Sequence, residues 1–76
     1  MTKLEAEQET VRRWYLLPPH LRETYEQAEA YAIRLDRELD FPSVTERRRL
    51  IAAWLIREVT TVNNLIRAAR GQREAA

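Results

Sequence analysis

The fold is decided by the stretch SVTERRRLIAAWLIREVTTVNNLIRAAR, residues 43–70, in which no residue interrupts a helix. Ser43 and Glu46 have the spacing of a capping box, in which the two side chains satisfy the first free amides of a helix reciprocally. Gly71 follows this stretch and supplies a C-terminal stop. We therefore predict a helix over residues 44–70, about 40 Å long at 1.5 Å per residue.

Two shorter helices precede it, because one glycine and three prolines leave little turn chemistry for a β protein. The first is expected at about residues 3–16, ending before Pro18. The second is expected at about 19–40, with Pro19 in its first turn. The first helix should bury one face, formed by Leu4, Val11, Trp14 and Tyr15. The second carries a heptad seam, formed by Leu21, Tyr25, Ala28, Ala32, Leu35 and Leu39.

The apolar residues of the long helix cover about half of its circumference at 100° per residue. They are Leu50, Ile51, Trp54, Leu55, Val59, Val62, Leu65, Ile66 and Ala69. Two neighbouring helices, one parallel and one antiparallel, are needed to cover so broad a face. Because the long helix exceeds both neighbours in length, part of its apolar face should overhang, and a second copy of the chain is the simplest cover.

These patterns predict an all-α, three-helix fold in one domain, residues 1–76, with a short tail at 71–76, assembled as a helical-bundle homodimer. Residues 1–42 carry six basic and nine acidic side chains, a net charge of −3, whereas residues 43–76 carry seven and three, a net charge of +4. A chain with this asymmetry can self-associate or meet an acidic partner with its C-terminal half. Its overall charge of +1 is too small for a protein that coats nucleic acid.

The composition argues against catalysis. The chain has no cysteine, one histidine (His20) and one glycine, which excludes a thiolate metal site and a glycine-rich phosphate loop. We expect no enzyme activity, no cofactor and no metal. The longest apolar run, residues 50–56, is too short to cross a bilayer and no signal peptide is recognisable, so a cytoplasmic location is expected. The preference for arginine over lysine indicates a GC-rich bacterial, plasmid or phage genome.

The arginines form the candidate nucleic-acid contacts, namely Arg47, Arg48, Arg49, Arg67 and Arg70, with Arg57 and Arg73 added in a dimer. Because successive helical residues point about 100° apart, the triplet Arg47–Arg49 fans around the helix instead of forming one surface. A solvated helix start is therefore the preferred interpretation. A hidden helix-turn-helix is disfavoured, because its turn would fall on residues 56–58, which include no breaker.

Glu58 is a candidate buried charge, since helical arithmetic places it near the centre of the apolar arc. An ion pair with Arg12, Arg13, Arg47 or a dimer mate's arginine would satisfy it. Four further residues are candidate protein contacts. Tyr31 lies off the predicted seam and Phe41 precedes a proline, so both are expected to be exposed anchors, and Ile33 and Ile56 are further candidates.

The function favoured by these observations is a small, non-enzymatic helical module of protein interaction or regulation, such as an inhibitor, adaptor or accessory subunit. Its partners would be a second copy of itself and another protein, with no membrane contact. The alternative is an accessory DNA-binding protein, which would act as a dimer through its arginine-rich C-terminal half.

Overall fold

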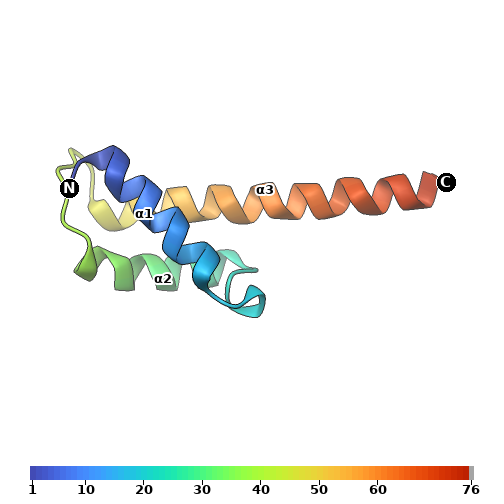
Figure 1. Ribbon diagram of the computed structural model, residues 1–76, viewed down its shortest axis with the longest axis horizontal. Coiled ribbons are helices and arrows are strands. Elements are labelled where there is room, and N and C mark those ends of the chain that lie inside the picture. Colours follow the sequence, from blue (N-terminus) through green and yellow to red (C-terminus); the bar gives the residue numbers. More distant parts are fainter. Residues whose placement is uncertain (76) are drawn as a thin grey trace.

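The computed structural model describes residues 1–75, with side chains described for residues 1–71. The elements are α1 (Lys3–Leu16), the short 3-10 turn η1 (Pro19–Leu21), α2 (Tyr25–Glu38) and α3 (Arg47–Ala75). Residues 1–75 contain no strand, so the predicted all-α fold of three helices is confirmed. In Figure 1, α1 and α2 lie against the first half of α3, and the second half of α3 projects beyond them.

α1 has the predicted bounds but buries a different face. Thr2 caps it, with the Glu5 amide donating to the Thr2 hydroxyl and the Glu5 carboxylate accepting from the Thr2 amide. The buried residues are Ala6, Thr10 and Trp14, whereas Leu4 is 62% exposed and Tyr15 is 39% exposed. Of the predicted face of Leu4, Val11, Trp14 and Tyr15, only Trp14 is buried and Val11 is half-buried, so the prediction is wrong for Leu4 and Tyr15. Small side chains at positions 6 and 10 let α1 approach its neighbours closely, and the large side chain of Trp14 fills the core one turn further on.

α2 begins at Tyr25 rather than at Pro19. Thr24 is its N-cap, and Thr24 and Gln27 form a complete capping box. The Gln27 side chain also donates to the carbonyl of His20, which ties η1 to the start of the helix. Leu21 and Tyr25 are 44% and 49% exposed. The predicted seam is thus buried only in its second part, at Ala28, Ala32, Leu35 and Leu39.

α3 begins at Arg47 and passes through Gly71, so both predicted ends are wrong. Ser43 accepts a hydrogen bond from the Thr45 amide at 3.3 Å and does not cap the helix. The connection before α3 carries Leu39 and Phe41 into the core, with the Phe41 ring 5.7 Å from that of Trp54. At Gly71 the absence of a side chain costs helix propensity, about 1 kcal/mol relative to alanine, but does not end the helix. Residues 56–58 are helical, which excludes the helix-turn-helix turn.

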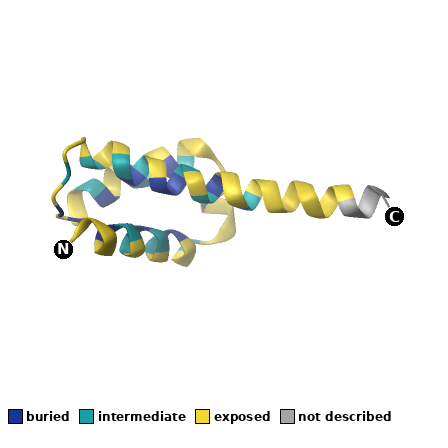
Figure 2. Ribbon diagram, turned by 90° about the horizontal axis from the view of Figure 1, so that it is seen from above, coloured by how far each residue is buried: buried dark blue, intermediate teal, exposed yellow. Residues whose placement is uncertain are grey.

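The core lies only between α1, α2 and the first half of α3, as the burial colours in Figure 2 show. α2 runs antiparallel to α3, and α1 crosses both (Figure 1). Trp14, Leu35, Ile51 and Leu55 are its largest fully buried apolar side chains. The molecule measures 49 × 20 × 18 Å with a Cα radius of gyration of 14.3 Å. A compact domain of this length has a radius of about 11 Å, so the projecting helix dominates the shape.

Candidate interaction surface

Two tyrosines mark the level on α3 at which the bundle ends. The Tyr25 hydroxyl, at the start of α2, lies 3.1 Å from the Thr60 hydroxyl. The Tyr15 hydroxyl, near the end of α1, donates to the Glu58 carboxylate at 3.1 Å. Burial of the phenol raises the pKa of Tyr15, and the hydrogen bond to the Glu58 carboxylate raises it further. Residues 61–75 therefore extend past the bundle by about 22 Å at 1.5 Å per residue; we call this segment the overhang.

The apolar stripe of α3 continues along the overhang. Val59 is the last buried residue of the stripe, at 2% exposed. Val62 is half-buried, Leu65 is 66% exposed and Ile66 is 47% exposed. The spacing of these residues, three or four positions, keeps them on one side of the helix. The expected overhang of the apolar face is thus confirmed, and no element within residues 1–71 covers its far part.

A groove of about 520 Å³ lies in the corner between η1 and the overhang. Val59, Val62 and Ile66 give it an apolar floor. Its other lining residues are Pro19, Arg22, Glu23, Asn63, Arg67 and Arg70. Three arginines and one glutamate make this rim net positive by two charges.

Arg22 is held in place on the bundle side of the groove. Its Nε donates to the carbonyl of Leu17 at 3.0 Å. Its guanidinium carbon lies 5.1 Å from the centre of the Tyr15 ring, within the range of a cation–π contact. The positive rim is therefore built from two separate parts of the chain, the connection before α2 and the overhang.

The arginines of α3 fall into two groups. In the bundle, each arginine of α3 has a carboxylate neighbour. Arg47 lies 2.8 Å from Asp40 and 3.8 Å from Asp36, and Arg57 lies 3.3 Å from Glu7. Arg48 and Arg49 both lie near Glu46, at 3.2 Å and 3.7 Å. Among residues 1–71, by contrast, Arg67 and Arg70 form no ion pair. The predicted nucleic-acid contacts are thus not one surface. The triplet is occupied by carboxylates, and Arg67 and Arg70 lie on the groove.

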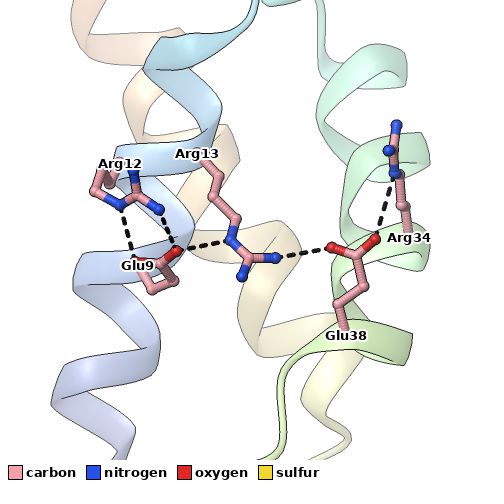
Figure 3. Close-up of polar contacts among 5 residues, drawn as sticks. All are labelled: Glu9, Arg12, Arg13, Arg34 and Glu38. Atoms are coloured by element: carbon pink, nitrogen blue, oxygen red, sulfur yellow. Dashed lines mark hydrogen bonds and ion pairs between the residues drawn. The ribbon is translucent and has the colours of Figure 1, made fainter.

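A second charged cluster, shown in Figure 3, joins α1 to α2. Glu9 accepts from Arg12 at 2.6 Å and from Arg13 at 2.7 Å, and Arg13 continues to Glu38 at 2.8 Å. Arg34 lies 3.6 Å from the other oxygen of Glu38. The hydrogen bonds from Arg12 and Arg13 lower the pKa of Glu9 to about 2. Every charge in this cluster meets an opposite charge, so we assign it to holding the two helices together.

Glu58 is not the buried charge that the sequence predicts. Its side chain is 19% exposed, and its neighbours are the Tyr15 hydroxyl and the Arg57 Nε, the latter at 3.5 Å. Among residues 1–71, Glu58 forms no ion pair with its predicted partners Arg12, Arg13 and Arg47. The residue lies at the end of the bundle, where water still reaches it.

The four residues predicted to contact another protein differ in their exposure. Phe41 is only 4% exposed and packs on Trp54, so its predicted exposure is wrong. Tyr31 is half-buried, with its ring 5.8 Å from that of Trp14. Ile56 is half-buried as well, and Ile33 is 45% exposed on the outer side of α2. The predicted contacts do not include Leu65 and Ile66. Their exposure could have been found from the sequence, because the helix that carries them is longer than its two neighbours.

Within the described part of the chain, no three histidine, cysteine, aspartate or glutamate side chains gather in a way that could hold a metal ion. No described helix is both long and apolar enough to span a membrane. No family model, curated protein or solved structure matches this chain.

Proposed function

We propose that the protein is a small non-enzymatic helical interaction module, an inhibitor, adaptor or accessory subunit of bacterial, plasmid or phage origin, that binds a partner protein along its overhang. One observation carries the proposal. The apolar stripe that forms the core of the bundle continues for about two further turns of α3, where Leu65 and Ile66 are exposed. Contiguous exposed apolar surface with a polar rim is typical of sites of protein interaction.

The energy of such a contact is substantial for so small a surface. Fully burying one large aliphatic side chain contributes about 1.5–3 kcal/mol. An isolated helix of about 15 residues is marginally stable in water, so a partner would also stabilise the overhang as a helix. An amphipathic helix laid into the groove is the binding mode that fits this geometry.

Self-association, the homodimer expected from the sequence, is a second way to cover the same face. An antiparallel pair of overhangs would bury Val62, Leu65 and Ile66 of both copies. It would also bring Arg67 and Arg70 of the two copies together, and like charges oppose this pairing. Sedimentation velocity at micromolar concentration separates the two cases, because a binding module awaiting another protein sediments as a monomer.

A nucleic-acid contact has less support. Four arginines of the C-terminal half already lie within 4 Å of carboxylates, so a phosphate would compete with these carboxylates for them. Binding to duplex DNA would still be detected as a gel shift that weakens steeply between about 50 and 200 mM salt.

The proposal is tested with the variant Leu65→Asp/Ile66→Asp, used as bait beside the wild-type protein in extracts of the source cells. Both side chains are already exposed, so the fold should persist and the melting temperature should stay within a few degrees. The matched control is Val44→Asp, because Val44 is fully exposed and lies outside the overhang. Loss of the same prey protein from the double variant alone supports the proposal. Retention of every prey protein by the double variant refutes it.

A further inference from the structure

The groove between η1 and the overhang combines an apolar floor with a positive rim. A segment that binds there should therefore carry both apolar and acidic side chains. We infer that the groove binds an acidic amphipathic helix of another protein, with apolar side chains on Val59, Val62 and Ile66 and carboxylates beside Arg22, Arg67 and Arg70. This inference rests on the proposed function and names the partner of the same surface.

The charge of the rim is the first argument. Of its four charged residues, three are arginines, and only Glu23 is acidic. Elsewhere on α3 every arginine of the bundle has a carboxylate within 4 Å. Within residues 1–71, Arg67 and Arg70 have none. The planar guanidinium of arginine offers several hydrogen-bond donors to one carboxylate. An acidic side chain of a partner would therefore pair with Arg67 and Arg70 as the carboxylates of the bundle pair with its own arginines.

The spacing of these residues is the second argument. Arg67 and Arg70 are three positions apart, so they lie near each other along one edge of the overhang. Arg22 comes from the bundle side and is fixed by the Leu17 carbonyl and the Tyr15 ring. A helix lying in the corner would meet positive charge on both sides of its apolar stripe. An occupant with carboxylates on both flanks matches this arrangement.

A second copy of the chain fits less well. Residues 61–75 carry Arg67, Arg70, Arg73 and Glu74, a net charge of +2, so two overhangs would repel each other. A phosphate backbone would satisfy the arginines but would leave the apolar floor at Val62 and Ile66 without an apolar partner.

The experiment uses the full chain and two fluorescein-labelled synthetic helices of about 20 residues. Both carry the same leucine stripe at i, i+3, i+4 and i+7. One has glutamate on both flanks, and the other has lysine at the same positions. Binding is followed by fluorescence anisotropy at 50 and 300 mM salt. The inference predicts that the acidic helix binds at least about tenfold more tightly at 50 mM salt, and that this preference shrinks at 300 mM.

Charge reversal gives the matched variants. Arg67→Glu/Arg70→Glu should lose the preference for the acidic helix and gain one for the basic helix. Arg37→Glu, on an exposed position of α2 outside the groove, should keep the original preference. Unchanged circular dichroism in both variants shows that the bundle is intact.

Four outcomes would overturn the inference: equal binding of both helices, tighter binding of the basic one, binding of neither, or displacement of the acidic helix by duplex DNA at equal charge. A dimer that persists at saturating acidic helix would also overturn it and assign the groove to a second copy. If the inference fails while Leu65→Asp/Ile66→Asp still loses its prey protein, the overhang remains the binding surface and only the acidic character of the partner is wrong.

Discussion

Thr10 is the one polar side chain that is fully buried within residues 1–71, at 0% exposed. Its hydroxyl oxygen has no hydrogen-bond partner among these residues. A buried hydroxyl without a partner costs about 1–3 kcal/mol, and valine has nearly the same shape without this oxygen. We predict that Thr10→Val raises the free energy of unfolding by about 1 kcal/mol, measured by urea denaturation.

Thr10→Ala is the control for this prediction. It also removes the hydroxyl, but it opens a cavity where the methyl group packed, so its free energy of unfolding should fall below that of Thr10→Val. If the valine variant were as unstable as the alanine variant, the hydroxyl would have a stabilising role.

Glu9 gives a prediction about pH. Folding lowers the pKa of its carboxyl from 4.5 to about 2 through the hydrogen bonds from Arg12 and Arg13. A lowered pKa in the folded state means that the stabilisation is complete above pH 4.5 and is lost as the pH falls towards 2. The wild-type protein should therefore exceed Glu9→Gln in urea midpoint at pH 6, and the difference should disappear near pH 2. A difference that stays constant between these pH values would contradict the assignment.

At the residue scale, the sequence predicts which side chains share one face of a helix more reliably than it predicts which of them are buried. Helical arithmetic correctly places Glu58 on the arc of Trp54 and Leu55, but it cannot show that the bundle ends there. Phe41 was expected to be exposed because it precedes a proline. Its burial depends on the contact with Trp54, a residue 13 positions away, which no local pattern contains.

At the scale of elements, three segments match the capping-box pattern and two form it, Thr2–Glu5 at α1 and Thr24–Gln27 at α2. Thr24–Gln27 caps α2, whereas Ser43–Glu46 lies before the first residue of α3. The pattern is local, but helix α3 begins later because Leu39 and Phe41 must first reach the core. The bounds of α1, by contrast, follow from Thr2 and Pro18 and were predictable. The existence and order of all three helices were also predictable, since proline and hydrophobic periodicity determine them.

Thr24 and Ser43 give a matched pair of variants. Thr24→Ala removes the side chain that accepts from the Gln27 amide, so the free energy of unfolding should fall by about 1 kcal/mol. Ser43→Ala removes only hydrogen bonds to the amide and hydroxyl of Thr45 in an exposed connection, so the change should stay within about 0.5 kcal/mol. Urea denaturation of both variants checks the pair, and equal losses would restore Ser43 as a cap.

At the scale of the whole molecule, stability should differ along α3. Residues 50–59 place one face in the core, whereas residues 64–71 contain no buried or half-buried residue. Helical segments without buried contacts open far more often than the core does. We predict that backbone amides of residues 64–71 exchange with deuterium at least about 100-fold faster than those of residues 50–59, measured by NMR in dilute protein.

The concentration dependence of this exchange is the control. Protection of residues 64–71 that rises with protein concentration would indicate that a second copy covers the overhang. Strong protection in dilute, monomeric protein would contradict the projection of α3 from the bundle.

The distribution of aromatic residues has a spectroscopic consequence. Trp14 and Trp54 are 1% and 7% exposed inside the bundle, and residues 61–71 contain no aromatic side chain. Tryptophan emission therefore responds to unfolding of the bundle, and neither tryptophan lines the groove. Because the chain has no cysteine, Asn64→Cys can carry a single dye that senses the overhang alone. One sample then reports folding and binding at two separate wavelengths.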